Sequence, residues 1–201
     1  MKWIVSQCVQ FLIKNNAIDP EDTDIYEYGL FCIVRDIITL SSTLIIAILL
    51  DVVPQSVLFY AAFIGLRRTA GGYHATTVLR CFLISMVTWL VALKCIELTQ
   101  SYHVLSIGIA AFATVIIWLL APIEHINNPH RKERLVLAKR NCRIYISILL
   151  LVVCISAWGS LQFLWPDWIP SSVAYGMFFF SCSLVAAWLQ RRFKQQKQLA
   201  E

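Results

Sequence analysis

No charged residue interrupts the sequence Val104-Leu-Ser-Ile-Gly-Ile-Ala-Ala-Phe-Ala-Thr-Val-Ile-Ile-Trp-Leu-Leu-Ala121. A helix needs roughly 20 consecutive, mostly apolar residues to cross the hydrocarbon layer of a bilayer. The apolar residues here form a continuous run and are not confined to one helical face, so the stretch predicts a membrane-spanning helix.

Five further apolar runs lie on either side of this one. They predict spans at 37–53, 54–66, 78–96, 144–161 and 172–189. The run 54–66 is short, and it reaches a spanning length only if Arg67 and Arg68 lie at the membrane interface or if the next segment is held partly inside protein. Of the 201 residues, 59% are hydrophobic and 14% are charged, which excludes an ordinary water-soluble globule. We therefore expect an all-α integral membrane protein with about six transmembrane helices, in one polytopic membrane domain over 1–201.

Lysine and arginine are distributed unevenly between the two sides that six spans create. One side holds Lys2, Lys14, Arg67, Arg68, Arg80, the basic residues of 131–143, Arg191, Arg192, Lys194 and Lys197. The connections on the other side, at 51–55, 97–103 and 162–171, contain neither residue type. Since positively charged flanks stay in the cytoplasm, we expect both termini to be cytoplasmic and the membrane to be that of a bacterial cell. Anionic lipids account for the net charge of +5, which therefore does not indicate a nucleic acid partner.

The two ends of the chain have their own expected roles. Residues 1–18 predict an amphipathic helix in the membrane interface, because Trp3, Ile4, Cys8, Phe11 and Leu12 recur along one helical stripe. No small-residue cleavage site follows, which argues against a cleaved signal. Residues 190–201 predict a basic cytoplasmic tail.

Seven cysteines are spread along the chain without a CxxC pair, and most of them fall in predicted spans or on the cytoplasmic side. We expect free thiols that pack as small apolar side chains, not disulfides. His125 and His130 share the predicted side of His74 and Cys81, but the spacing fits no established zinc site. No metal and no other cofactor is therefore expected.

One segment breaks the apolar pattern between the second and third predicted spans. It reads Arg67-Arg-Thr-Ala-Gly-Gly-Tyr-His74-Ala-Thr-Thr-Val-Leu-Arg-Cys81 and brings an imidazole and a thiol close together in sequence. In an unbroken helix these two residues would be about 10 Å apart along the axis, too far for a hydrogen bond. The chain must therefore bend between them if they are to act together.

The residues of this segment favour such a bend. Gly71 and Gly72 provide the backbone freedom, and Thr76 or Thr77 can cap the next helix. Cys81 then lies in or just past the first turn of that helix, while His74 lies on the bend and can take its proton, as a cysteine nucleophile requires. On spacing alone, a capping histidine and a packed thiol remain the alternative.

The segment as a whole resembles the signature of the AgrB family of quorum-sensing peptide processors. In that family an arginine-rich, glycine-containing stretch carries the catalytic histidine seven residues before the catalytic cysteine. The matching residues here are Arg67, Gly72, His74 and Cys81. The stretch 121–129, Ala-Pro-Ile-Glu-His-Ile-Asn-Asn-Pro, resembles the family at the end of the fourth span. Length, predicted spans and amphipathic start also agree, so the resemblance covers essentially the whole chain.

The resemblance implies a membrane cysteine endopeptidase that acts on a small AgrD-like propeptide with an amphipathic leader, a short signal segment and a charged C-terminal tail. It implies that His74 is the general base and that Cys81 is the nucleophile. The tail would leave, and a thiol or hydroxyl of the peptide would then resolve a thioester on Cys81 by closing a thiolactone or lactone ring. The resemblance also implies a homodimer. An apolar face of the third span that includes Trp89 would supply the contact, although contact with lipid explains that face equally well.

Other roles in such a site stay open. Glu124, Asn127 and Asn128 either orient His74 or serve as helix caps and loop residues. Backbone N–H groups near Gly71 and Gly72 are candidates for an oxyanion hole. 

Arg67 and Arg68 have two interpretations: they set the topology, or they hold the acidic tail of the substrate as a bidentate clamp. A peptide exporter or small transporter is the alternative function. Charged residues that would mark a transport path are few, since Arg35 and Asp36 lie near a predicted span end. Neither an inverted repeat nor a nucleotide-binding loop is evident.

Overall fold

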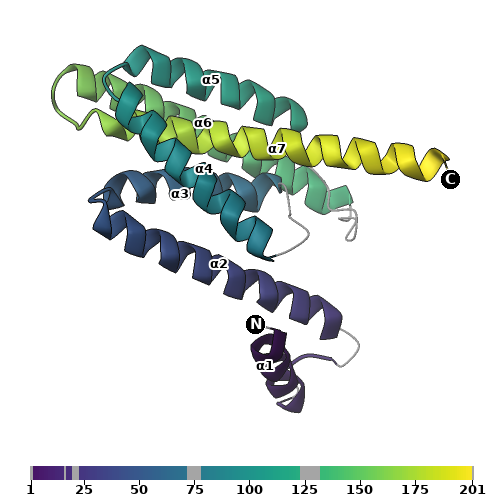
Figure 1. The fold of residues 1–201 in the computed structure, drawn as a ribbon. Coiled ribbons are helices and arrows are strands. Elements are labelled where there is room, and N and C mark those ends of the chain that lie inside the picture. The colour runs from purple at the N-terminus through teal and green to yellow at the C-terminus, as the bar shows by residue number, and fades with distance from the viewer. Residues whose placement is uncertain (1, 16, 20–22, 72–77, 123–131, 201) are drawn as a thin grey trace.

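The computed structural model describes residues 2–15, 17–19, 23–71, 78–122 and 132–200, and the regular elements within these ranges are all helices (Figure 1). In chain order they are α1 (Lys2–Lys14), α2 (Thr23–Leu49), α3 (Val53–Ala70), α4 (Val78–Thr99), α5 (His103–Leu120), α6 (Lys132–Leu161) and α7 (Trp168–Ala200). Helices α2 to α7 run back and forth along one bundle, and α1 lies at one end of it (Figure 1). The predicted all-α fold is confirmed.

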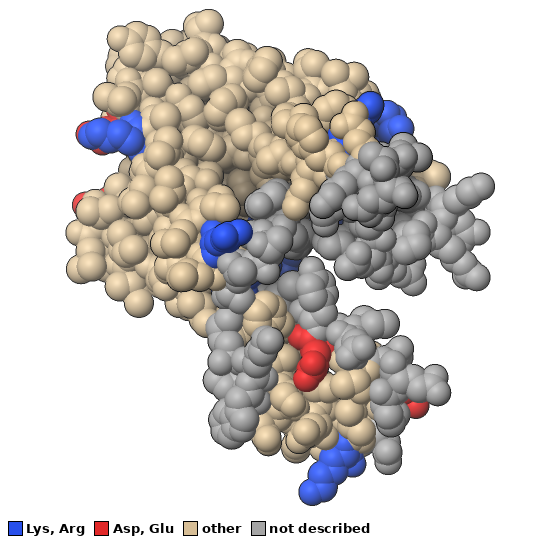
Figure 2. Space-filling model, turned by 45° about the vertical axis from the view of Figure 1, so that its right-hand side comes forward, with Lys and Arg blue, Asp and Glu red and all other residues tan. Residues whose placement is uncertain are grey.

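Five stretches are long and apolar enough to cross a membrane: Gly29–Leu49, Leu79–Thr99, His103–Leu120, Val136–Leu161 and Trp168–Phe193. Large apolar side chains are exposed along them, among them Leu44, Val87, Leu119 and Leu151. Figure 2 shows the result as a broad uncharged area, with patches of Lys and Arg at its edges. Such a surface suits hydrocarbon and not water, and the chain is a multi-pass membrane protein.

The predicted span 54–66 corresponds to α3, which is not among these five stretches. Pro54 stands in its first turn, where a missing backbone N–H costs nothing, and Arg67 and Arg68 stand in its last turn. Phe59 and Leu66 are buried, and α3 packs against α6 and α7. Protein thus surrounds this short helix on several sides. That α3 crosses the bilayer stays a prediction.

The first span was predicted to start at residue 37, whereas the stretch of α2 that is long and apolar enough to span a membrane is Gly29–Leu49. Arg35 and Asp36 had suggested the edge of the membrane. Both lie inside α2, where Arg35 is buried and pairs with Asp36.

Helix α7 is the central helix of the bundle and packs against α3, α4, α5 and α6. Small residues allow these helices to approach closely, as is common in membrane bundles. Gly176 faces α3, and Ala110, Ala113 and Ala174 are fully buried between α5 and α7. The hydroxyls of Ser106 and Ser171 share a hydrogen bond of 2.9 Å in the same interface.

Helix α1 packs on α2. Among the side chains that the structure describes in α1, Val5 and Val9, one turn apart, are buried, whereas Cys8 and Phe11 of the predicted apolar stripe are exposed. These two members of the stripe therefore do not pack against the rest of the protein. Its position in the membrane interface stays a prediction.

Trp89 does not lie on an outer face of α4, and the expectation that it could form a contact between subunits is wrong. The indole is fully buried, and its N–H donates a hydrogen bond of 3.1 Å to the hydroxyl of Ser56 in α3. An indole N–H needs such a partner when it leaves water, which favours a position between helices over one facing lipid.

Candidate active site

The break that was predicted between the second and third spans begins at Gly71. Helix α3 ends at Ala70, and the N–H of Gly71 donates to the carbonyl oxygen of Arg67 at 3.1 Å. Gly71 has φ 78° and ψ −153°, a combination that is open almost only to glycine. The next described helix, α4, begins at Val78, so Cys81 is its fourth residue and lies in the first turn, as predicted.

Several predicted site residues lie outside the residues that the structure describes. They are Gly72, His74, Glu124, Asn127 and Asn128, together with His125 and His130. The pairing of His74 with Cys81 and the identity of a third member of the site therefore stay predictions. Arg67, Arg68, Gly71 and Cys81 are described.

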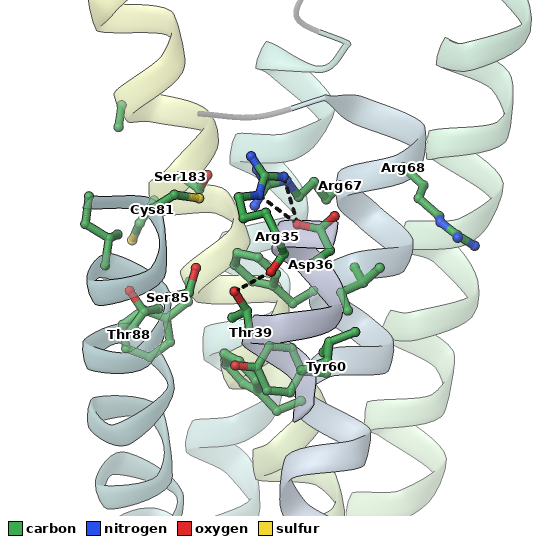
Figure 3. Close-up of a pocket in the computed structure, with 18 residues that line it drawn as sticks. Arg35, Asp36, Thr39, Tyr60, Arg67, Arg68, Cys81, Ser85, Thr88 and Ser183 are labelled. Carbon is green, nitrogen blue, oxygen red and sulfur yellow. Dashed lines mark hydrogen bonds and ion pairs between the residues drawn. The ribbon is translucent and has the colours of Figure 1, made fainter. Parts of the chain in front are cut away.

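Cys81 lines a cavity of about 790 Å³ that lies between four helices (Figure 3). The size is within the range that is usual for ligand pockets. The lining residues are Arg35, Asp36, Thr39 and Leu40 of α2; Phe59, Tyr60, Phe63, Ile64, Arg67 and Arg68 of α3; Cys81, Ile84, Ser85 and Thr88 of α4; and Phe179, Cys182, Ser183 and Ala186 of α7. Cys81 itself is half-buried, so its thiol lies at a protein-lined site and not on an open surface.

The lining is polar at one end and mixed along its length. In Figure 3 the side chains of Arg35, Arg67 and Cys81 lie at the same level of the bundle, close to the end of α3 and the start of α4. Ser85 and Thr88 follow further along α4, and Tyr60 lies deeper on the other side. A bound chain would therefore meet charged groups and the thiol at one end and hydroxyls and apolar walls along the rest.

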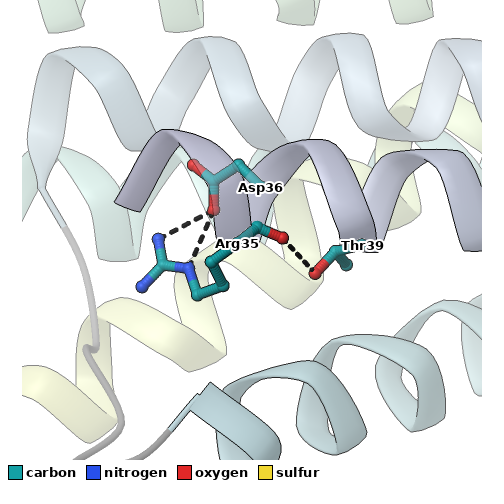
Figure 4. A network of polar contacts seen from close by, with 3 residues as sticks. All are labelled: Arg35, Asp36 and Thr39. Atoms are coloured by element: carbon teal, nitrogen blue, oxygen red, sulfur yellow. Dashed lines mark hydrogen bonds and ion pairs between the residues drawn. The ribbon is translucent and has the colours of Figure 1, made fainter. Parts of the chain in front are cut away.

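Arg35 is the most deeply placed charged group of this lining. Its Nε and Nη2 atoms donate to the same carboxylate oxygen of Asp36, Oδ1, at 3.0 and 2.7 Å (Figure 4). The Arg35 side chain is only 9% exposed, whereas that of Asp36 is 60% exposed. Thr39 closes the next turn by donating to the carbonyl oxygen of Arg35 at 3.0 Å. The bundle thus shields the guanidinium of Arg35, whereas the carboxylate of Asp36 that it contacts is largely exposed.

The walls of the cavity are held by contacts between helices. Tyr60 and the hydroxyl of Thr43 form a hydrogen bond of 3.2 Å that ties α3 to α2. The ring of Phe59 stacks on Phe63 with centroids 5.9 Å apart and meets Phe179 of α7 edge-on at 6.3 Å. Such aromatic contacts and buried hydrogen bonds fix the distance between the lining helices.

Sequence reasoning identified Arg67, Arg68 and Cys81 but missed the role of α2 in this site. A signal was present: Arg35, Thr39 and Thr43 recur at intervals of four residues along an otherwise apolar helix. These positions share one helical face, and the structure turns that face toward the protein.

A second, mostly apolar hollow of about 490 Å³ lies between α2 and α3. It shares Leu40, Tyr60, Ile64 and Arg68 with the first cavity, so the two adjoin. Its other lining residues include Leu44 and Val57, which are exposed on the outside of the bundle.

Comparison with known proteins agrees with the resemblance seen in the sequence. The family model described as Accessory gene regulator B matches residues 5–190 of the chain. A putative AgrB-like protein of Listeria monocytogenes serotype 4a is 29% identical over 111 residues, which are 53% of this chain and 54% of the relative. A putative AgrB-like protein of Listeria innocua serovar 6a is 29% identical over 112 residues, 53% of this chain and 55% of the relative. The chain thus aligns with about half the length of these relatives. No solved structure matches it at a significant level.

Proposed function

The chain belongs to the accessory gene regulator B family, and we propose that it is a membrane cysteine endopeptidase that processes an AgrD-like propeptide into a cyclic quorum-sensing signal. The observation that carries the proposal is the position of Cys81, which is in the first turn of α4 and lines the cavity formed by α2, α3, α4 and α7. A nucleophilic thiol is useful only where a peptide can be held beside it, and this cavity offers such a place.

The first step proposed is attack by the Cys81 sulfur on the carbonyl carbon at the junction between the signal segment and the C-terminal tail. His74 takes the thiol proton and returns it to the departing amine, so that a C–S bond forms and the C–N bond breaks. The tail leaves as a peptide with a free amino group, and the signal segment remains as a thioester on Cys81. Backbone N–H groups near Gly71 and Gly72 are our candidates to hold the developing oxyanion.

The second step is ring closure. A thiol or hydroxyl within the bound peptide attacks the thioester carbonyl, the C–S bond breaks, and the proton returns to the Cys81 sulfur. The product is a thiolactone or a lactone, according to the nucleophile. A cavity with walls such as Phe59, Phe63 and Ile84 supports this route over hydrolysis, because it keeps water away while the internal nucleophile is held close.

The orientation proposed places both termini and the Cys81 end of the bundle in the cytoplasm, in a bacterial cell membrane. Arg67, Arg68, Arg80, Arg191 and Arg192 stand near that end of their helices, where cytoplasmic retention of positive charge would keep them. Glu124 and Asn127 are proposed as residues that orient His74. Family resemblance also supports a homodimer, which chemical cross-linking in native membranes would detect.

The experiment that tests the function is mass spectrometry of the purified protein in lipid with the propeptide encoded beside its gene. Wild type should release the C-terminal tail and carry an acyl adduct on Cys81, whereas Cys81→Ala and His74→Ala should do neither. Cys154→Ala, which removes an exposed thiol on the outside of α6, should cleave like wild type. A peptide that binds but stays uncut in wild type would favour the exporter or small transporter instead, as would transport that persists in Cys81→Ala.

A further inference from the structure

We propose that Arg143 and Trp118 form a binding site for the phosphate of an anionic phospholipid, at the place where α5 and α6 pack together near one end of the bundle. The site is separate from the cavity of Cys81, because neither residue lines that cavity. The proposal therefore goes beyond the peptidase function and does not rest on it.

The guanidinium of Arg143 lies against an aromatic ring of the neighbouring helix. Its Cζ atom is 4.5 Å from the ring centroid of Trp118, so the contact joins α6 to α5. A cation over an indole is attracted by the electrons of the ring. This attraction positions the guanidinium but does not supply hydrogen-bond acceptors for its five N–H groups.

Acceptors for Arg143 are missing among the residues that the structure describes. Its Nε atom is buried and has no hydrogen-bond partner there. The ion pairs between described residues do not include Arg143 either. Shielding a charged donor from water without an acceptor costs free energy. An anion that accepts from the outer N–H groups of this half-buried side chain would offset that cost.

The helices around Arg143 offer almost no carboxylate. Helix α6 packs against α3, α5 and α7, and these three helices contain neither Asp nor Glu. Helix α6 contains one, Glu133, which stands ten residues before Arg143 and thus about 15 Å away along the helix axis. The anion that neutralises Arg143 therefore does not come from these four helices.

The position of Arg143 along the bundle favours a lipid phosphate as this anion. Arg143 lies about 10 Å inside the stretch Val136–Leu161, which is long and apolar enough to cross the membrane. Helical side chains point toward the N-terminus of their helix, so the guanidinium reaches back toward the exposed Lys139 and Arg140. Trp118 stands in the last turn of α5, and tryptophan is typical of the headgroup level. At that level the anions within reach are those of acidic lipids.

The surface next to Arg143 and Trp118 suits acyl chains. The end of α5 and the start of α6 lie at the same end of the bundle (Figure 1). Leu119 and Ile144, the next residues in sequence, are both exposed, and Ile148 is exposed one turn further along α6. A ligand with an anionic head and apolar chains matches this surface, whereas a soluble anion matches its polar part only.

The test measures lipid binding to the full chain in detergent by native mass spectrometry. The probes are phosphatidylglycerol and phosphatidylcholine with identical acyl chains, and wild type should bind the first about 10-fold more tightly. Arg143→Gln should remove most of this preference, as expected for loss of hydrogen bonds between charged groups. Arg143→Lys should fall in between, because an ammonium group keeps the charge but not the planar fork.

Two further variants separate a specific site from a general effect. Trp118→Leu keeps Arg143 but removes the ring that positions it, and it should weaken binding of phosphatidylglycerol a few-fold. Arg192→Gln is the matched control. Its guanidinium also lies over a tryptophan, Trp188 at 4.8 Å, but Arg192 is exposed and both groups belong to α7. This control removes the same charge and should leave the lipid preference unchanged.

The proposal is overturned if wild type binds both lipids equally. It also fails if Arg192→Gln reduces the preference as much as Arg143→Gln, since general attraction between charges would then explain the binding. Displacement of phosphatidylglycerol by excess inorganic phosphate would show that the ligand is a free anion, which contradicts the proposal as well.

A carboxylate from the part of the chain that the structure does not describe is the remaining alternative. If Glu124 were the partner of Arg143, Glu124→Gln and Arg143→Gln would lower the melting temperature in phosphatidylcholine equally, and the double variant would lower it no further. That result would overturn the lipid site. Propeptide cleavage enters none of these measurements, so failure of the peptidase function would leave their outcome standing, and the reverse is also true.

Discussion

Gly176 of α7 lies directly against the backbone of Phe59 in α3: a Cβ atom at Gly176 would come within 2.7 Å of the Phe59 carbonyl oxygen and 2.8 Å of the Ala62 Cβ. Both values are too short for real contacts, so α3 and α7 would have to move apart if residue 176 carried a side chain. The same two helices carry Phe59, Tyr60, Cys182 and Ser183 into the cavity.

Gly176→Ala is therefore expected to lower the free energy of unfolding by about 1 to 3 kcal/mol, as overpacking does elsewhere. Thermal unfolding in detergent measures this. Gly108→Ala is the matched control, because nothing lies within 4 Å of its added Cβ and alanine is the better helix former. Equal melting temperatures for the two variants would contradict the close approach.

Trp89→Phe is expected to destabilise the bundle by about 1 to 3 kcal/mol, because it leaves the buried hydroxyl of Ser56 without its donor and leaves space unfilled. Once Trp89→Phe has removed the indole N–H, the hydrogen bond to Ser56 is already lost. Ser56→Ala should therefore lower the free energy of unfolding less in the Trp89→Phe background than in wild type. A double-mutant cycle on melting temperatures measures the coupling. Strictly additive effects would argue against the hydrogen bond.

Gly71→Ala is expected to raise the conformational energy of the backbone at residue 71 by about 1 to 3 kcal/mol, because alanine rarely adopts φ 78° with ψ −153°. We expect a large loss of propeptide cleavage with little change in melting temperature, since the strain falls on the connection between α3 and α4 and not on the core. Gly29→Ala, in open surroundings on α2, should retain activity. Cleavage at the wild-type rate by Gly71→Ala would show that this backbone shape does not matter for the reaction.

Single-cysteine variants should report the orientation. In a background without native cysteines, the variant Lys94→Cys, near the end of α4, should react with a membrane-impermeant maleimide added to whole cells. The variant Arg192→Cys, in α7, should react only after lysis, because this position is expected in the cytoplasm. The reverse pattern would invert the proposed topology.

The regular parts of the fold were predictable because each depends on a local property of the chain. The run 104–121 became α5, His103–Leu120, since an uncharged stretch of that length leaves few other options. Cys81 was placed in the first turn of α4 for a similar reason: glycine and threonine marked the break before it. The bounds of the first span were less predictable, because a charged pair part-way along α2 does not by itself mark where a membrane begins.

The candidate site was predictable only along one segment. Arg67, Gly71 and Cys81 are close together in sequence, but the cavity also needs Arg35 from α2 and Ser183 from α7. Whether these residues come together depends on which helices pack side by side, and the spacing of apolar residues along the sequence does not predict that. Trp89 shows the same limit, since its hydrogen-bond partner, Ser56, belongs to another helix.

The hollow between α2 and α3 offers a substrate of the proposed site a route of entry from within the membrane. It shares Leu40, Tyr60, Ile64 and Arg68 with the Cys81 cavity, and its residues Leu44 and Val57 are exposed on the outside of the bundle. A peptide anchored in the bilayer can approach from that side by two-dimensional diffusion. Its encounter rate then follows the number of peptides per area of membrane, so that crowding of the bilayer, and not dilution in the surrounding water, sets how often the thiol meets its target.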